Sequence, residues 1–348
     1  MVCPRIRKEW QRTWCDFQCR LPILEKEQDK ETVRYLSIIS IFTILLTNCV
    51  TEPYIKDSGM VFGTTYAITY QYNEDLKSDI EAVMQQVDNS LSPFNKSSVI
   101  TAINNNTSME VDENLTKVFT LAKTVSQETN GAFDITVAPL VNAWGFGFKS
   151  GIKPTDEQID SILAFVGQEK VTLQNGKITK TDPRIMLDCS AIAKGYGVDM
   201  VAEFLASKGI KNYLVEIGGE ISARGKNPNG TEWKIGVTKP VDDSLSINQE
   251  NQTVLEITDQ ALATSGNYRN FYYEGGKKYA HTINPHTGKP AQSDILSATV
   301  IAPSCAIADA YATAFMVLGS DKAKEILKKH PELKAYFILS DYSTWQSM

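Results

Sequence analysis

Two of the chain's three histidines, His281 and His286, lie in one short segment, Tyr279-Ala-His-Thr-Ile-Asn-Pro-His-Thr-Gly-Lys-Pro290. Apolar and polar residues alternate up to Asn284-Pro285, and Gly288 follows shortly after. Proline fixes φ and glycine permits a reversal, so this pattern predicts a strand that ends in a tight polar turn. A histidine beside such a turn can accept a proton or bind an anion. The segment also fits a β-turn without chemistry, and only its neighbours can decide between the two.

A second block, Gly131-Ala-Phe-Asp-Ile-Thr-Val-Ala-Pro-Leu-Val-Asn-Ala-Trp-Gly-Phe146, follows a predicted helix end. It contains a strand-like run from Phe133 to Val137 and then two aromatic residues, Trp144 and Phe146. Aromatic side chains beside glycine can form a planar slot for a ring system, or they can be ordinary core residues.

A third block, Leu187-Asp-Cys-Ser-Ala-Ile-Ala-Lys-Gly-Tyr196, combines an apolar run that ends in Asp188 with small residues at a helix start. Unpaired amides at a helix N-terminus attract phosphate, and Lys194 would add a cation one turn later. The alternative is a capped helix that carries a solvated lysine.

Two shorter motifs carry weaker signals. In Val215-Glu-Ile-Gly-Gly-Glu-Ile221, Gly218 and Gly219 interrupt a strand, which indicates a bulge or a place where a substrate approaches the main chain. In Ala308-Asp-Ala-Tyr-Ala-Thr313, Asp309 and Thr313 are four residues apart and share one face of a helix. A carboxylate and a hydroxyl in this arrangement can bind Mg²⁺ through oxygen. They also fit an exposed aspartate and a threonine bonded to its own helix.

The elements that must position these residues follow from the spacing of apolar side chains. Helical spacing predicts helices at residues 76–91, 113–130, 155–167, 190–209 and 306–318, the third of which opens with the capping box Thr155-Asp-Glu-Gln158. Alternation predicts strands at residues 61–72, 213–217, 232–238, 253–258, 268–274, 279–283, 296–302 and 335–340. Because the strands come mostly in runs, we expect an α+β fold with a largely antiparallel sheet and packed helices.

Composition excludes several classes of protein. The chain has 348 residues and a net charge of −6, without a Lys/Arg-rich block after residue 50. Nucleic-acid binding requires clustered cations, so a nucleic-acid partner is not expected. Three histidines and no Cys-x-x-Cys argue against zinc, and any metal should be a hard cation bound by oxygens.

The first residues differ from the rest of the chain. Residues 36–46 are apolar, follow Arg34 and end at Thr47-Asn-Cys49. Eleven helical residues rise only ~16 Å, too little to span a bilayer but suitable for the apolar region of a signal peptide. Leu46-Thr-Asn-Cys49 resembles a bacterial lipobox, so we expect a lipoprotein signal peptide at 33–48, lipidation of Cys49 and a tether at 49–57.

Residues 1–32 do not fit such a leader, because they form a long segment with two tryptophans and three cysteines. We expect translation to begin at a non-ATG start at Val33, with 1–32 as a non-native extension. The processed chain would then keep Cys49, Cys189 and Cys305, and the last two are candidates for a disulfide.

Taken together, the motifs resemble the ApbE-type FAD:protein FMN transferases. The resemblance covers roughly residues 58–345 and implies an ApbE-like, T-fold-related domain at 58–348. It is carried by Gly63-Thr-Thr65, Leu91-Ser-Pro-Phe94, the Phe133–Phe146 block, Asp188…Lys194-Gly-Tyr196, Gly218-Gly219, Thr264-Ser-Gly266, His281…Pro285…Thr287-Gly288…Pro290 and Asp309…Thr313.

The resemblance assigns a role to each matching residue. It implies Mg²⁺-dependent transfer of FMN from FAD to a Thr or Ser hydroxyl of an acceptor protein, with release of AMP. The implied metal ligands are the Ala191 carbonyl, Asp309 and Thr313. The implied FAD contacts are Phe94, Ala132, Phe133, Asp134, Asp188, Lys194, Gly218, Gly219, Ser265, Gly266 and His281.

Three further expectations follow. His281 is our candidate general base and Asp309 the second candidate catalytic residue, whereas His286 is expected at the surface. Asn284 stands where the family more often has Asp, which puts an acid/base role there in doubt. The acceptor implied by the resemblance is a membrane redox-complex subunit, of the sodium-translocating NADH:quinone reductase or Rnf type.

The enzyme itself would be anchored by its lipid to the bacterial membrane, facing the periplasm or cell exterior. Two alternatives remain open: an FAD pyrophosphatase that uses water as nucleophile, and a non-catalytic FAD-binding lipoprotein.

Overall fold

The computed structural model describes residues 52–147, 153–240, 250–268, 271–274 and 277–347. The predicted extension 1–32, the predicted signal peptide 33–48 and Cys49 lie outside these residues. Within the described ranges, no helix is both long enough and apolar enough to cross a bilayer.

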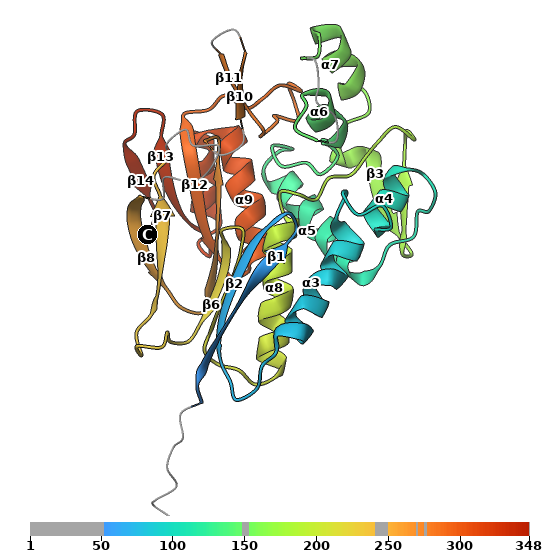
Figure 1. Ribbon diagram of the computed structural model, residues 1–348. Coiled ribbons are helices and arrows are strands. Elements are labelled where there is room, and N and C mark those ends of the chain that lie inside the picture. The colour runs from blue at the N-terminus through green and yellow to red at the C-terminus, as the bar shows by residue number, and fades with distance from the viewer. Residues whose placement is uncertain (1–51, 148–152, 241–249, 269–270, 275–276, 348) are drawn as a thin grey trace, which may run out of the picture. The chain divides into compact units, whose positions relative to one another are not determined.

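An eight-stranded antiparallel sheet forms the centre of the domain (Figure 1). Its first and last strands in the chain are the edge strands, and β12 lies inside it. In spatial order the strands are β1 (Tyr54–Val61), β2 (Thr64–Gln71), β5 (Tyr213–Ile217), β6 (Glu220–Arg224), β9 (Gln260–Gly266), β12 (Ile295–Ala302), β13 (Lys334–Leu339) and β14 (Thr344–Gln346).

Helices cover one face of this sheet (Figure 1). Strand alternation sends Tyr66, Ile68 and Tyr70 of β2 into a core with α3 and α8, and sends Ala298 and Val300 of β12 into a core with α5 and α9. The long helices are α3 (Lys77–Leu91), α5 (Glu113–Glu128), α8 (Ala193–Ser207), α9 (Cys305–Leu318) and α10 (Ser320–Lys329).

The other face of the sheet is covered by a hairpin of β7 (Trp233–Thr238) and β8 (Asn251–Ile257), which packs on Ile221, Leu262 and Ile301. Smaller elements complete the domain. They are α4 (Val99–Asn104), α6 (Ala138–Ala143), α7 (Asp156–Leu163), the 3₁₀ helix η1 (Gln168–Lys170), the hairpin β3 (Val171–Gln174) with β4 (Lys177–Lys180), and the hairpin β10 (Phe271–Glu274) with β11 (Lys277–Ala280).

The predicted α+β class with a largely antiparallel sheet is confirmed. Each predicted helix is present, and Thr155 and Gln158 form the predicted capping box. The tether prediction for 49–57 is wrong from Tyr54 onward, because β1 already pairs there with β2. The strand-like reading of 133–137 is also wrong: this stretch is a series of turns that leads into α6.

Two sequence predictions about smaller features are resolved by the fold. Gly218 and Gly219, with φ of 64° and 103°, form the two-residue turn of the β5–β6 hairpin rather than a bulge. Cys189 and Cys305 are both buried free thiols, so the candidate disulfide is not formed.

Helix α9 is held at its N-terminus by α8. The Asp199 carboxylate accepts hydrogen bonds from the backbone amides of Cys305 (2.7 Å) and Ala306 (2.8 Å), and Ser304 caps the helix. Gly195 of α8 lies against the same turn, and a Cβ there would come within 2.4 Å of the Cys305 carbonyl oxygen. The two helices can approach this closely only because residue 195 has no side chain.

Replacing Gly195 by Ala should therefore push α9 away from α8. We expect a loss of about 2 kcal/mol in the free energy of unfolding, because the overpacking penalty of ~1–3 kcal/mol exceeds the better helix propensity of alanine. Urea denaturation measures it, and Glu203→Ala, an exposed position on the same helix, is the matched control. Equal stability of Gly195→Ala and the parent would contradict this packing argument.

Candidate active site

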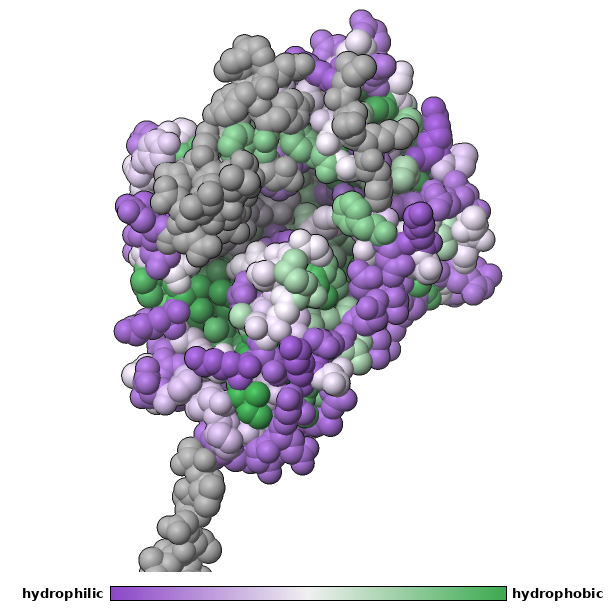
Figure 2. Space-filling model, in the orientation of Figure 1, coloured by the Kyte–Doolittle hydropathy of each residue, from purple (hydrophilic) through white to green (hydrophobic). Residues whose placement is uncertain are grey.

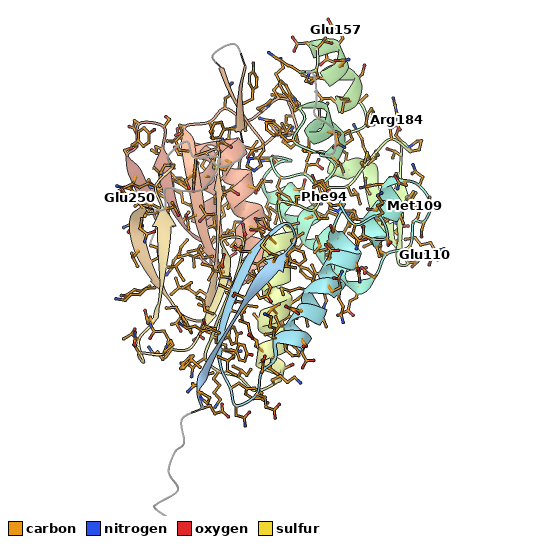
Figure 3. All side chains as sticks on the ribbon, viewed as in Figure 1. Phe94, Met109, Glu110, Glu157, Arg184 and Glu250 are labelled. Carbon is orange, nitrogen blue, oxygen red and sulfur yellow. The ribbon has the colours of Figure 1, made fainter. Side chains whose placement is uncertain are left out.

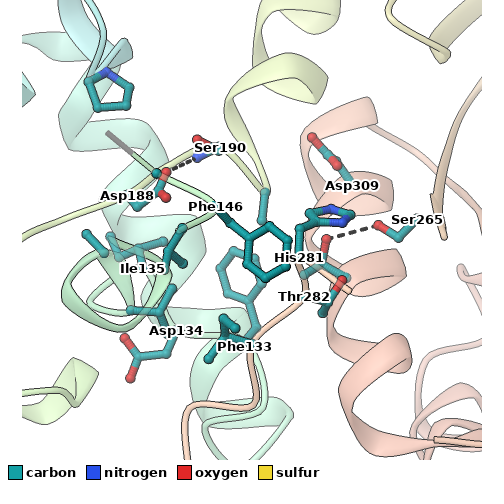
Figure 4. Close-up of a pocket in the computed structure, with 18 of the residues that line it drawn as sticks. Phe133, Asp134, Ile135, Phe146, Asp188, Ser190, Ser265, His281, Thr282 and Asp309 are labelled. Carbon is teal, nitrogen blue, oxygen red and sulfur yellow. Dashed lines mark hydrogen bonds between the residues drawn. The ribbon is translucent and has the colours of Figure 1, made fainter. Parts of the chain in front are cut away.

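One cavity of about 460 Å³ collects most of the residues selected from the sequence. Its walls come from segments far apart in the chain: the 132–147 loop, the 186–194 segment, the β5–β6 turn, the end of β9, the 281–285 segment and α9 (Figure 4). In the space-filling view, hydrophilic residues gather on the right and lower sides, and the surface is hollowed near its middle (Figure 2). The volume lies within the range of small-molecule sites.

The apolar wall consists of aromatic and aliphatic side chains from the 132–146 loop. Phe133, Ile135 and Phe146 line the cavity and lie across it from Asp309 and His281 (Figure 4). Phe94 borders the cavity and is 68 % exposed, so it lies at the mouth (Figure 3). Such a wall suits the flat face of an aromatic ring system.

Trp144 does not line the cavity, so the prediction that Trp144 and Phe146 together form an aromatic slot is wrong for Trp144. Its indole is buried, stacks on Tyr279 and donates from Nε1 to the carbonyl oxygen of Gly288 at 2.7 Å. Trp144 therefore fixes the 281–288 turn against α6, while Phe146 is the aromatic residue that lines the cavity.

Asp134 shapes the loop through its carboxylate. Oδ1 accepts from the amide and the hydroxyl of Thr136, both at 2.7 Å, and Oδ2 accepts from the amide of Gln168 at 2.9 Å. These bonds turn the chain at 134–136, which explains why no strand forms there. Burial raises the pKa of Asp134, and the same hydrogen bonds oppose the rise.

The start of α8 does not offer the predicted set of unpaired amides. The Ser190 amide donates to Asp188 Oδ1 at 2.8 Å, those of Ile192 and Ala193 donate to the Cys189 carbonyl, and that of Gly195 donates to Asp309. Four of the amides at the helix start are thus already paired, and the Lys194 ammonium group supplies a positive charge at the cavity.

A compact charge cluster forms the polar end of the cavity. Lys194 Nζ donates to Glu220 Oε1 at 2.5 Å, and Asp309 Oδ2 accepts from the Gly195 amide at 3.1 Å. Glu220 and Asp309 are buried, whereas the Lys194 side chain is 32 % exposed toward the cavity. Burial raises the pKa values of both carboxyl groups, and the charge of Lys194 counteracts that rise.

Glu220 was missed as a site residue by the sequence analysis. Its Oε1 pairs with Lys194, but its buried Oε2 has no hydrogen-bond partner in the described part of the chain. The sequence signal for Glu220 is the register of the hairpin. A two-residue Gly-Gly turn pairs Glu220 with Ile217, and paired residues on neighbouring strands point to the same face of the sheet. Because Ile217 faces the helical core, Glu220 does so too. A carboxylate at a core-facing position is unusual enough to indicate a functional site.

The oxygen ligands proposed for Mg²⁺ lie around the same end of the cavity. Ala191, Asp309 and Thr313 all line it, and the Thr313 hydroxyl lies 3.0 Å from that of Ser265. The described residues contain no group of three or more His, Cys, Asp or Glu side chains that could hold a metal. One carboxylate, one hydroxyl and one carbonyl suit a hard cation that keeps water and phosphate ligands, so the donor set fits Mg²⁺.

The three residues singled out in the 281–290 segment have different positions. His281 lines the cavity near Asp309 (Figure 4), whereas His286 is exposed, as predicted, and its Nε2 lies 2.8 Å from the Asn130 carbonyl oxygen. The Asn284 side chain accepts from the amides of His286 (2.9 Å) and Thr287 (3.3 Å). Asn284 therefore caps the turn that presents His281.

The remaining predicted contacts are placed as follows. Asp188, Gly218, Ser265 and Gly266 line the cavity, as does Ala132. Gly219 is not among the lining residues; its amide donates to Glu216 Oε1 at 2.7 Å within the hairpin turn. Gly219 therefore lies next to the cavity-lining Gly218 without lining the cavity itself.

The aromatic wall and the lysine–carboxylate cluster, on an α+β fold, suit an enzyme that acts on a nucleotide. The chain belongs to the ApbE family, whose sequence profile matches residues 62–337.

Several relatives and solved structures are similar over most of the chain. The FAD:protein FMN transferase of Vibrio cholerae is 39 % identical over 280 residues, which cover 77 % of this chain and 83 % of that protein. The corresponding protein of Haemophilus influenzae is 38 % identical over 302 residues, which cover 82 % of this chain and 86 % of that protein. The structure of the flavin transferase ApbE from Vibrio cholerae superposes with a TM-score of 0.76 at 35 % identity. The superposition covers 84 % of this chain and 96 % of that structure. The apo structure of Pseudomonas stutzeri flavinyl transferase ApbE superposes with a TM-score of 0.76 at 29 % identity, over 86 % of this chain and 96 % of that structure.

The charge cluster predicts a specific stability pattern. Lys194→Met leaves two buried carboxylates without their cation, so we expect the free energy of unfolding to fall by about 2 kcal/mol. This loss is smaller than for a fully buried ion pair, because the cavity admits solvent. Glu220→Gln added to Lys194→Met should restore part of that loss.

Urea denaturation of the metal-free single and double variants measures this coupling as a mutant cycle. Lys117→Met is the matched control, because it breaks only the exposed ion pair with Glu113 and should change stability far less. Additive effects of the two cavity substitutions would show that Lys194 and Glu220 do not interact.

Proposed function

We infer that this chain is an FAD:protein FMN transferase, which moves the FMN half of FAD onto a hydroxyl group of another protein. The observation that carries this function is the composition of the cavity, whose lining combines an aromatic wall for the flavin ring with the charged groups Lys194 and Asp309. Curated relatives with this activity match most of the chain, which supports the same conclusion.

The reaction is a phosphoryl-group transfer. The hydroxyl oxygen of an acceptor Thr or Ser forms a bond to the phosphorus of the FMN half, and the bond from that phosphorus to the bridging oxygen breaks. AMP leaves with the bridging oxygen, and the hydroxyl proton passes to a base. Positioning and charge neutralisation account for most of the catalysis in such transfers.

His281 is the base that we propose for this proton. It lines the cavity near Asp309, and the capped turn behind it, closed by Asn284 and Trp144, fixes its backbone. A ring nitrogen of neutral histidine can accept the hydroxyl proton as the new bond forms and then release it to solvent.

We propose that Ala191, Asp309 and Thr313 hold Mg²⁺ at the pyrophosphate. A bound Mg²⁺ would neutralise charge on the phosphate oxygens. Lys194 supplies a fixed positive charge at the same place, and Glu220 keeps that ammonium group at the cavity wall.

The acceptor and the cellular location remain proposals from the sequence. We propose that the acceptor is a Thr- or Ser-flavinylated subunit of a membrane redox complex, of the sodium-translocating NADH:quinone reductase or Rnf type. We also propose that Cys49 is lipidated and anchors the enzyme to the bacterial membrane, facing the periplasm or exterior.

Removing the proposed base tests the mechanism. His281→Ala should lower the rate of FMN transfer by about 10²–10⁴-fold while FAD affinity stays within a few-fold. In-gel flavin fluorescence of a Thr-bearing acceptor measures transfer, and fluorescence titration measures FAD binding. His330→Ala, which removes a histidine distant in sequence from the cavity segments, is the matched control. If His281→Ala transferred FMN at the parent rate, His281 would not be the general base.

Removing the metal carboxylate tests the Mg²⁺ assignment. Asp309→Ala should lose at least about 100-fold in transfer rate and respond no longer to Mg²⁺, because the site loses its charged ligand. Titration of activity with Mg²⁺ after treatment with a chelator measures the response, with Asp321→Ala on the surface of α10 as control. A Mg²⁺ response retained by Asp309→Ala would refute the assignment.

A further inference from the structure

A second cavity, of about 580 Å³, adjoins the FAD cavity. Asp134 and Pro285 line both, so the two spaces are separated only by the 131–134 loop and the 285–286 turn. The second cavity is also lined by Lys123, Ser126 and Gln127 of α5, by Asn130 and Gly131 after that helix, by Gln168 and Glu169 of η1 with Val166 and Gly167 before it, and by His286.

Gln168 in this wall is in an energetically unfavourable state. Its side chain is 94 % buried, since its exposed fraction is 6 %, and neither Nε2 nor Oε1 has a hydrogen-bond partner in the described part of the chain. Each unpaired buried polar atom costs about 1–3 kcal/mol. The backbone N–H of Gln168 donates to Asp134 Oδ2, and this hydrogen bond holds the backbone in place. The side-chain carboxamide therefore stays in this wall.

The composition of the cavity selects the kind of ligand. Three carboxamides, from Gln127, Asn130 and Gln168, line it, with the opposite charges of Lys123 and Glu169 at exposed positions. With Asp134 also in the lining, two carboxylates face one lysine, and this charge does not favour a phosphate. The lining contains no aromatic ring apart from the His286 imidazole, so a second flavin is not favoured either. A carboxamide can donate to a carbonyl and accept from an N–H at once, which is the pattern of a peptide group.

The same pairing occurs inside this chain. The Asn104 side chain donates from Nδ2 to the Leu187 carbonyl oxygen at 2.9 Å and accepts from the Leu187 amide at 2.7 Å. One carboxamide thus binds both main-chain polar groups of one residue, Leu187, and fixes the 187–188 segment beside the FAD cavity.

We propose that the second cavity binds the main chain of the acceptor protein, next to the hydroxyl-bearing residue, with Gln168 pairing to one of its peptide groups. This inference rests on the proposed transferase function and assigns its acceptor site. An extended segment advances ~3.3–3.6 Å per residue, so a few acceptor residues would pass from the second cavity over Pro285 to the FAD cavity. The side of the 281–288 turn that carries His286 would then face the acceptor, and His281 would face FAD.

The test separates recognition of the acceptor from recognition of FAD. Steady-state transfer is measured with FAD, Mg²⁺ and the flavin-accepting exported domain of an Rnf-type subunit, varying one substrate at a time. Gln168→Leu should raise the KM for the acceptor domain about 10-fold, with kcat and the KM for FAD within about two-fold of the parent. Its thermal stability should hold or rise, because the variant buries no unpaired amide.

Two further variants complete the design. Gln127→Ala, at an exposed position on α5, should also raise the KM for the acceptor, and it carries the test if Gln168→Leu does not fold. Gln252→Leu, exposed on β8 and outside both cavities, is the matched control.

If the parent protein labels the acceptor but neither cavity variant changes its KM beyond about two-fold, Gln168 does not bind the acceptor and the proposed acceptor site is wrong. If the parent protein does not label the acceptor at all, the transferase function fails instead.

Discussion

The contact between Gly195 of α8 and the first turn of α9 is the constraint on which the site depends. It lets the Gly195 amide reach the Asp309 carboxylate, and it brings Lys194 beside Glu220 on the neighbouring hairpin. Three charged groups from α8, β6 and α9 are thereby held at the end of one cavity. Burying carboxylates is unfavourable unless a cation is close, so this cluster requires Lys194 in the folded protein and has capacity left for a bound cation.

A second set of contacts fixes the flavin side of the cavity relative to this cluster. Asp134 turns the 132–136 loop by binding Thr136 and Gln168, and Trp144 ties the 281–288 turn to α6 through the Gly288 carbonyl. The aromatic wall and His281 are thus held by hydrogen bonds that lie outside the reacting groups.

The sequence was sufficient for the parts of the structure with strong periodicity or local chemistry. Apolar spacing located α3, α5 and α9, and the capping box located α7. It failed where distant residues decide the conformation: Asp134 binds the amide of Gln168, which no local pattern reveals, and the supposed strand 133–137 became a turn. Glu220 was missed because its importance comes from Lys194 and Asp309 on other elements. The candidate metal and flavin residues were chosen chiefly because several motifs occur together in the order of a known family, and the fold places all of them but Gly219 in the lining of one cavity.

The central claim is that an acceptor hydroxyl, and not water, attacks the FMN phosphorus of FAD. It is tested most directly by running the reaction in ¹⁸O-labelled water with a Thr-bearing acceptor domain and analysing the products by mass spectrometry. We expect an acceptor that carries one FMN ester, an equal amount of AMP, and no ¹⁸O in either product. Free FMN that contains ¹⁸O, with an unmodified acceptor, would show that the site hydrolyses FAD and would contradict the account.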